Sequence, residues 1–576
     1  MSHDAPPSSR IPAERPTRRH LAWILVALSY LAVAPYFPRI NNPNENVRIW
    51  MTRAIVVDHT LAIDRVTADW GYVDDKAVYG GHLYSSKAPG TSFLGVPVLW
   101  LQTKVWRVCG WPAPSKRAVT FALRYLTVVP CALAFLFIFG RWVEGRARST
   151  AARDLLTVAV GLGTLLYPYG ILYMGHAQAA MLAFCAFMAL GWPNTRQAAG
   201  PLPTGEAAPR TDLIPGDGPS AGSSGVVSGA PSARALMTAG ALAGTAVIFE
   251  YQALLVALAV AGLAAWRGRW RSGWFALGAL PPALALGAYH AVAFGRPWSF
   301  PYGHLENQTY AHLHHGSGFF GLQLPRGEAL GASLFSVSYG LLVFSPFLAV
   351  GAVSLVRRAL RPPRAEAIAV LSACVALILF LAGMTHWRAG WCVGPRYIAA
   401  IAPLLASGLA LDWSWFAGGG GSDRAAAWRR GVLGGLVVVA VALNGLSAAT
   451  YPHYPEQFDN PVFDLALPAW RDGYVPSGWG HALGLPRLFA LLPVATLWAA
   501  ALGVALTASD AAPRPRLGRR AFPAAVAVAV AAGALTLLSA YGRRPSSAEA
   551  HATTLVRALW DPPPQGPERP AAARGP

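Results

Sequence analysis

Apolar stretches separated by short polar connections dominate the chain from Leu21 to Leu538. Most of them run for about 15 to 24 residues, the length that a helix needs to cross the hydrocarbon core of a bilayer. The alternation of apolar and polar positions that marks the strands of a membrane barrel is absent from them. Since backbone groups in lipid must find hydrogen-bond partners within their own segment, the pattern predicts an all-α polytopic membrane protein.

The pattern predicts about thirteen transmembrane helices. We expect them at 21–37, 118–140, 154–172, 177–192, 235–249, 251–266, 272–294, 333–356, 367–384, 397–415, 431–450, 486–506 and 521–541. The first stretch is followed by no small-residue cleavage pattern, which favours a retained span over a signal peptide.

One further apolar segment, residues 93–108, is predicted to lie along the membrane surface. Pro97 interrupts it, and polar side chains gather toward its end. If this segment crossed the bilayer, the arginine clusters that follow would fall on the wrong side. If it lies along the outer surface, all of them fall on the cytoplasmic side, as the positive-inside rule requires. The clusters are at 141–153, 267–271, 357–364, 424–430 and 514–520.

These assignments divide the chain into five parts. They are a disordered cytoplasmic tail at 1–20, a membrane module at 21–192 with a large first extracytoplasmic loop at 38–117, a disordered cytoplasmic linker at 193–233, further transmembrane helices with outer loops at 234–541, and a Pro-rich tail at 542–576. The topology places the N-terminus inside and the C-terminus outside.

The formal net charge of +20 would suggest nucleic acid in a soluble protein. Here the arginines cluster between apolar stretches, so cytoplasmic anchoring explains the charge and no nucleic-acid partner is expected. The five cysteines show no metal-ligand spacing. Cys109 and Cys392 are the two expected on the outer side, where a disulfide between them is an open alternative.

Residues 41–91 are the most polar stretch, in a chain of which 13% of the residues are charged. All four lysines of the protein lie in this stretch or just after it, whereas the other 43 of its 47 cationic residues are arginine. Six carboxylates lie in it: Glu45, Asp58, Asp64, Asp69, Asp74 and Asp75. Such a loop on a very apolar chain suggests chemistry at a membrane surface.

Two motifs in this region resemble the first extracytoplasmic loop of the GT-C superfamily of membrane glycosyltransferases. They are NENVRIWMTRAIV and, about 40 residues later, GGHLYSSKAPGTSFLGVPVLWL. The similarity is to the branch of bacterial aminoarabinose transferases and protein mannosyltransferases. Asn44-Glu45 match the acidic pair that opens the loop in that branch, and Lys87-Ala88-Pro89 match its Lys-Pro-Pro. A later stretch, HWRAGWCVGPRY, resembles an element of related bacterial membrane proteins.

The resemblance implies transfer of a sugar from a polyprenyl-phosphate donor, on the outer face of the bacterial inner membrane, by inverting displacement with a loop carboxylate as base. Membrane lipids and a glycan, lipid or protein acceptor would be the other partners. Two positions depart from the family pattern. The leading Asp of the acidic pair is Asn44, and the acidic position of the second loop is His176. The base has therefore moved by one residue, or the acceptor differs.

Glu45 is the candidate base by position, since it opens a predicted interfacial helix beside the first span. Its structural alternative is a carboxylate that interacts with the helix dipole. Lys87 is the candidate donor-phosphate ligand, because a compact cation at a turn suits a lipid phosphate. Its alternative is snorkelling to lipid head groups.

Arg388 and Arg396 are further candidates for the donor phosphate, and interfacial anchoring is their alternative. Asp74 and Asp75 could hold a divalent metal together with Glu45, although paired loop carboxylates are more often solvated. His176 could contribute to the site or simply be a satisfied helix-end histidine. Glu250 lies between two apolar stretches and is interpreted as part of an outer hairpin, unless it is buried, in which case a functional role is expected.

Two other functions remain open at this point. A transporter or flippase of lipid-linked glycans would place its charges and broken helices near the membrane midplane, whereas here the charges lie in outer loops. A glycan ligase or polymerase would use the same donor chemistry. No cofactor is required by the sequence, and a divalent metal is left open.

The topology can be tested directly. Reporter fusions after Arg148 and after Arg544 should give a cytoplasmic signal at the first position and an external signal at the second, because residues 93–108 do not cross the bilayer. An external signal after Arg148 would show that this segment spans the membrane.

Overall fold

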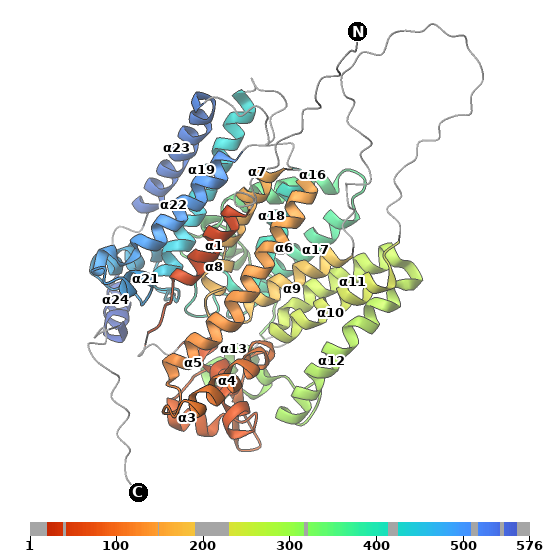
Figure 1. The fold of residues 1–576 in the computed structure, drawn as a ribbon. Coiled ribbons are helices and arrows are strands. Elements are labelled where there is room, and N and C mark those ends of the chain that lie inside the picture. The colour runs from red at the N-terminus through yellow and green to blue at the C-terminus, as the bar shows by residue number, and fades with distance from the viewer. Residues whose placement is uncertain are drawn as a thin grey trace, which may run out of the picture.

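The computed structural model describes residues 20–37, 42–147, 149–190, 230–315, 321–412, 424–508, 517–541 and 546–560. Nearly all regular structure in these residues is helical (Figure 1). Six helical stretches are long and apolar enough to cross a membrane: Lys116–Ala147, Tyr251–Phe294, Ala365–Gly383, Arg424–Ala449, Leu488–Thr507 and Phe522–Ala540. Four shorter apolar helices accompany them. The predicted class, an all-α integral membrane protein, is confirmed.

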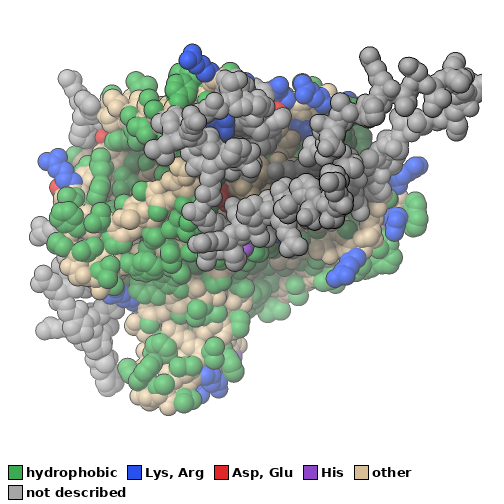
Figure 2. Space-filling model, turned by 45° about the horizontal axis from the view of Figure 1, so that its top comes forward, with side chains coloured by type: hydrophobic (Ala, Val, Ile, Leu, Met, Phe, Trp, Pro, Cys, Tyr) green, Lys and Arg blue, Asp and Glu red, His purple; other side chains and the backbone are tan. Residues whose placement is uncertain are grey.

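Most of the predicted spans correspond to helices. They are α1 (Leu21–Ala32), α5 (Lys116–Leu123) continuing through η2 (Arg124–Val128) into α6 (Val129–Ala147), α7 (Thr150–Leu162), α9 (His176–Ala189), α10 (Ala233–Phe249), α11 (Leu254–Gly268), α12 (Gly273–Phe294), α17 (Ala365–Gly383), α18 (Ile401–Leu411), α19 (Arg424–Ala449), α22 (Leu492–Thr507) and α23 (Leu517–Ala540). Hydrophobic side chains cover much of the visible flank of this body, and Lys and Arg side chains gather toward its edges (Figure 2).

Two predicted spans are broken. The segment expected at 333–356 consists of α14 (Gly327–Phe335), α15 (Leu341–Phe344) and α16 (Phe347–Ala359). The expected span at 154–172 divides into α7 and α8 (Leu166–Tyr169). In the first case the chain leaves the helix at Ser336, whose extended backbone ends α14, and Pro346 precedes α16. Hydropathy alone does not register such breaks, because the residues on both sides are apolar.

The first loop forms a compact layer at one end of the helical body (Figure 1). It contains α2 (Pro43–Arg53), η1 (Ala54–Asp58), α3 (Asp64–Trp70), the antiparallel strands β1 (Lys76–Tyr79) and β2 (His82–Ser85), and α4 (Gly90–Val108). Asn42 caps α2 by accepting a hydrogen bond from the backbone N–H of Glu45, and Pro43 occupies the first turn. Gly80 and Gly81 both have positive φ and make the tight turn of the hairpin.

The segment predicted to be interfacial is the helix α4, which packs on α2 and α5. Its outer face exposes the large apolar side chains Trp100, Leu101, Val105 and Val108. An amphipathic helix of this kind suits the boundary between lipid head groups and acyl chains. Whether it crosses a bilayer stays a prediction, to be decided by the reporter fusions.

Three predictions concern segments near or beyond the limits of the described residues. The tail at 1–19 and the linker at 193–229 lie outside them. Within the expected Pro-rich tail, residues 547–560 form a helix that was not predicted, α24 (Ser547–Trp560). Ser546 and Glu549 cap it reciprocally. The Ser546 hydroxyl accepts a hydrogen bond from the backbone N–H of Glu549, and the Glu549 carboxylate accepts one from the backbone N–H of Ser546.

The disulfide considered between Cys109 and Cys392 is not formed in this structure. Cys109 is exposed, Cys392 is buried, and both are free thiols.

Helices α10 and α12 cross with almost no space between their backbones. A Cβ atom at Gly240 would lie 2.0 Å from the carbonyl oxygen of Phe275, and one at Gly278 would lie 2.0 Å from that of Met237. Gly240 and Gly244 have the four-residue spacing that permits close helix contact in membranes. Glycine is therefore required at this crossing for packing.

We expect Gly240→Ala to lower the stability of the protein in detergent by on the order of 1–3 kcal/mol, because the added methyl group must displace backbone atoms of α12. Gly262→Ala on α11 is the matched control, since a Cβ atom there meets nothing within 4 Å. The measurement is the thermal unfolding midpoint of both variants. Equal midpoints would show that the crossing adjusts freely.

Candidate active site

Ionisable residues from distant parts of the sequence meet between the first loop and the helical body. Each of them is largely buried. They are Arg48 on α2, Asp75 before β1, Lys87 in the turn before α4, His176 at the start of α9, Glu250 after α10, and Arg396 in η7 (Arg396–Ile398). Four of these six, Lys87, Arg396, Asp75 and His176, are among the predicted site residues.

Lys87 and Asp75 form an ion pair with 3.0 Å between Nζ and Oδ1. Burial would raise the pKa of the Asp75 carboxyl, but Lys87, with smaller contributions from Arg396 and Arg48, holds that pKa below its usual value. Asp75 is therefore ionised at neutral pH. Lys87 lies in the KAPG turn, just before Pro89, which occupies the N-cap position of α4.

Glu250 was interpreted as part of an outer hairpin, with a functional role expected if it is buried. It lies in the connection between α10 and α11, and its side chain is only 9% exposed and lies inside the site. Its backbone is extended, with φ −150° and ψ 123°, which ends α10 and turns the carboxylate toward the first loop. Burial raises the pKa of Glu250, and Arg48 opposes this effect only in part.

Arg48 was not predicted as a site residue. Its Nη2 atom donates to Oε1 of Glu250 over 2.6 Å. Its Nη1 atom donates to the Asn44 carbonyl over 2.9 Å and also contacts the Asn44 side-chain oxygen. The predicted contributor Asn44 therefore orients Arg48. An arginine one turn into an interfacial helix was the only signal in the sequence, and it does not distinguish this role from anchoring.

Arg396 and Arg48 each keep an Nε–H group for which the described residues supply no hydrogen-bond partner. Both guanidinium groups are buried, so these donors are also shielded from solvent. Three cations, Arg48, Lys87 and Arg396, are set against the carboxylates of Asp75 and Glu250. This excess of positive charge, with unsatisfied N–H groups, is suited to bind an anionic group.

Glu45, the predicted base, is held in a closed ion pair. Its two carboxylate oxygens accept from Nε and Nη2 of Arg124 over 2.6 Å and 2.5 Å, and Oε1 also accepts from the backbone N–H of Tyr173 over 2.7 Å. Burial would raise the pKa of Glu45, but Arg124 and Tyr173 together lower it. A carboxylate with a lowered pKa and occupied lone pairs is a weak proton acceptor, so the structure favours a positioning role.

The remaining predicted residues lie at the margin of the site. Arg388 donates from Nη2 to the Ser338 hydroxyl over 3.3 Å, and its guanidinium lies against the rings of Tyr339 and Trp387. Asp74 lies beside Tyr72, whose pKa rises to about 12 through burial and the charges of Asp74 and Glu306. Within the described ranges, no three His, Cys, Asp or Glu side chains are arranged to hold a metal ion. The proposed metal set of Glu45, Asp74 and Asp75 is therefore not assembled.

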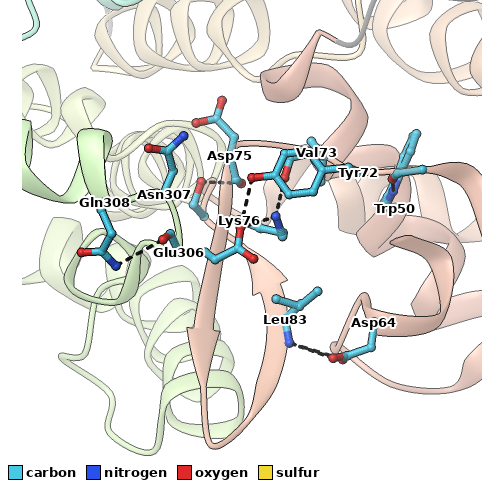
Figure 3. Close-up of polar contacts among 12 residues, drawn as sticks. Trp50, Asp64, Tyr72, Val73, Asp75, Lys76, Leu83, Glu306, Asn307 and Gln308 are labelled. Carbon is cyan, nitrogen blue, oxygen red and sulfur yellow. Dashed lines mark hydrogen bonds and ion pairs between the residues drawn. The ribbon is translucent and has the colours of Figure 1, made fainter. Parts of the chain in front are cut away.

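The loop that follows α12 contacts the β1–β2 hairpin through Glu306 and Leu305 (Figure 3). The buried Lys76 ammonium contacts the Glu306 carboxylate, which also accepts from the Tyr72 hydroxyl over 3.3 Å. The backbone N–H of Glu306 donates to the Lys76 carbonyl over 3.1 Å, and Leu305 pairs with Ala77. These contacts place Tyr302, in η6 (Pro301–His304), with its ring centre 5.6 Å from Nζ of Lys87.

An apolar groove ends beside this site. It lies between α10, α11 and α12, has a volume of about 450 Å³, and is lined by side chains such as Ala243, Leu254, Leu258, Pro282 and Leu286. At one end it reaches His290 and Phe300, which contact Tyr251, the neighbour of Glu250. Tyr251 in turn contacts Tyr302. The side chain of Tyr251 therefore lies between the groove and the charged cluster.

Comparison with known proteins finds similarity to solved structures alone, and the sequence identities are low. No family model matches the chain, and no curated protein matches it. Solved structures similar to it include ArnT from Cupriavidus metallidurans bound to undecaprenyl phosphate, with 14% identity, a TM-score of 0.41, and coverage of 90% of this chain and 77% of that one.

The oligosaccharyltransferase of Archaeoglobus fulgidus has 12% identity, a TM-score of 0.38, and coverage of 81% and 60%. Arabinosyltransferase EmbB from Mycobacterium smegmatis has 14% identity, a TM-score of 0.39, and coverage of 96% and 44%. This chain thus spans less than two thirds of the last two proteins. The last two are named as sugar transferases, an oligosaccharyltransferase and an arabinosyltransferase. TM-scores of this size decide neither activity nor substrate.

The position of Glu45 generates a stability prediction. Glu45→Gln leaves Arg124 buried without its counter-charge, so we expect a loss on the order of 3–5 kcal/mol at neutral pH. Because the folded-state pKa of Glu45 is lowered, its stabilisation is present above the ordinary carboxyl pKa and disappears as the pH falls through the folded-state value. Wild type and variant should therefore converge in acid.

Thermal unfolding in detergent from pH 8 down to about pH 2 measures this difference, because the stabilisation is lost only below the ordinary carboxyl pKa. The exposed Glu328→Gln is the matched control. If Glu45 were instead a free catalytic base, its replacement would leave the unfolding midpoint unchanged and reduce turnover alone.

Proposed function

We propose that this protein is a membrane glycosyltransferase that moves a sugar from a polyprenyl-phosphate donor to an acceptor on the extracytoplasmic face of a bacterial inner membrane. The observation that carries the proposal is the cluster of Lys87, Arg396 and Arg48 with Asp75 and Glu250, at the end of an apolar groove. A lipid phosphate is complementary to this arrangement, because it carries an anionic group on a long apolar chain.

Lys87 and Arg396 would bind the donor phosphate and stabilise the negative charge that develops on it as the sugar leaves. The groove between α10, α11 and α12 would hold the first isoprene units, because its lining is almost wholly apolar. Tyr251 and Tyr302 lie where the apolar and charged parts meet. Burial of the site strengthens each electrostatic contact by excluding water.

Glu250 replaces Glu45 as the proposed base. In the reaction, an acceptor hydroxyl attacks the anomeric carbon, the bond from that carbon to the phosphate oxygen breaks, and the hydroxyl proton passes to Glu250. A single displacement of this kind inverts the anomeric configuration. A raised pKa suits this role, since a base is most effective when its pKa lies near the working pH. Asp75 would instead orient Lys87.

Binding and turnover should separate in two variants. Lys87→Ala should weaken binding of undecaprenyl phosphate about tenfold or more, because a charge-assisted contact is lost. Glu250→Gln should not weaken this binding, because it removes only negative charge from the cluster, and should lower sugar transfer by about a hundredfold. The measurements are native mass spectrometry with undecaprenyl phosphate and transfer of labelled sugar from polyprenyl-phosphate donors. Lys104→Ala, which removes an exposed lysine of α4, is the control and should change neither quantity.

The pH dependence of transfer gives the same experiment a second readout. Wild-type turnover should fall in acid with a midpoint above the ordinary carboxyl value of 4.5, because Glu250 must be ionised to accept a proton and its pKa is raised. Full transfer by Glu250→Gln would contradict the assignment of the base. Movement of the lipid across vesicle membranes without formation of a glycosidic bond would instead indicate a flippase.

A further inference from the structure

His176 is buried beside the proposed base but takes no part in the contacts described so far. Its side chain is 1% exposed. Within the described part of the chain, neither ring nitrogen has a hydrogen-bond partner. Buried polar atoms are nearly always satisfied in folded proteins, so an imidazole with both nitrogens unpaired requires an explanation. It indicates a bond that forms in another state of the site.

The backbone brings His176 close to Glu250. Nδ1 of His176 lies 3.4 Å from Oε1 of Glu250, just beyond an aligned hydrogen bond. Gly175 makes this approach sterically accessible, since a Cβ atom there would lie 2.7 Å from Oε1 of Glu250 and 2.3 Å from the Phe249 carbonyl oxygen. Any other residue at 175 would force the second loop away from the end of α10.

The groups around the pair determine its charge. Arg48 on α2, Lys87 before α4 and Arg396 in η7 act on both His176 and Glu250. Tyr169 and Tyr397 lie against the imidazole ring, and Tyr251 and Tyr302 face Glu250. Burial lowers the pKa of His176, and the three nearby cations lower it further, so the ring is neutral and carries one N–H group and one lone pair.

We propose that His176 is a positioning residue for Glu250, with its Nδ1–H group donating to Oε1 of the carboxylate when the site binds its substrates. This inference rests on the proposed function only in giving Glu250 the role of base. The donated hydrogen bond would fix one carboxylate oxygen between His176 and Arg48 and direct the other toward the acceptor hydroxyl. His176 keeps its proton throughout, and the acceptor proton goes to Glu250.

The two proton positions on a neutral imidazole have different consequences. A donor at Nδ1 favours the ionised form of Glu250, so its loss should move the titration of Glu250 to higher pH. An acceptor at Nδ1 would favour the protonated form, and its loss would move the titration to lower pH. Loss of a histidine with a purely structural role would leave the titration of Glu250 unchanged.

The test is infrared titration of the full-length protein labelled with ¹³C-glutamate, with undecaprenyl phosphate bound, in which the Glu250 carboxyl band is the difference between wild type and Glu250→Gln. In His176→Leu the midpoint of this band should rise by about one pH unit, as expected for one lost hydrogen bond to the charged form. His176→Gln retains an N–H donor and should titrate close to wild type. His312→Leu, at an exposed position on α13 (Gln308–His315), is the control.

A second measurement needs no destabilising variant. Solid-state NMR of the ¹⁵N-histidine-labelled protein, with the His176 signal assigned by its absence in His176→Gln, should show a neutral ring protonated at Nδ1. A ring protonated at Nε2, or a midpoint that stays or falls in His176→Leu, would overturn the inference. Neither measurement depends on sugar transfer. Absence of transfer by wild type would therefore count against the proposed function and not against the pairing of His176 with Glu250.

Discussion

The bidentate ion pair between Glu45 and Arg124 is the interaction on which the position of the first loop depends. Two buried charges this close must remain together, because either one alone would be very unfavourable in an apolar environment. Arg124 also donates to the Pro35 carbonyl, and Glu45 also accepts from the backbone of Tyr173. The pair therefore joins the end of α1, the start of α2, the long helix through η2 and the short second loop at a single point.

The helical geometry of α2 carries this constraint into the site. Arg48 lies three residues after Glu45, close to one turn of helix away. Fixing Glu45 against Arg124 therefore also fixes the direction in which Arg48 leaves α2, toward Glu250. In this way a buried pair, in which Arg124 holds both carboxylate oxygens of Glu45, sets the positions of Arg48 and Glu250.

The environments of three buried carboxylates separate their roles. Glu45 and Asp75 each have a dedicated cation, and both have lowered pKa values. Glu250 shares Arg48 with Asn44, contacts an imidazole that gives it no aligned hydrogen bond, and has a raised pKa. Divergent pKa values within one site are how proteins assign distinct proton-transfer roles to chemically equal groups.

The sequence predicted the membrane class, most helix positions, the polar first loop and four residues that meet in the site. Each depends on local pattern: hydropathy, arginine clusters, and the KAPG turn that presents Lys87. The sequence did not predict Arg48 or the burial of Glu250, because both depend on contact between segments about 200 residues apart. Glu45 was assigned as the base from its place in a motif, and the motif does not reveal that Arg124 occupies both of its oxygens.

The same pairing that makes the site stable also limits how it can bind an anion. Without a ligand, Asp75 compensates the charge of Lys87 and Glu250 that of Arg48, so neither cation is buried alone. Arg396, whose Nε–H group is unpaired, carries the remaining positive charge. A phosphate that enters must share Lys87 with Asp75, which weakens its hold on that lysine but leaves the carboxylate to orient the ammonium. The transferase that we propose must release its lipid phosphate after each transfer, and a lysine already shared with a carboxylate meets that requirement better than an unshared one.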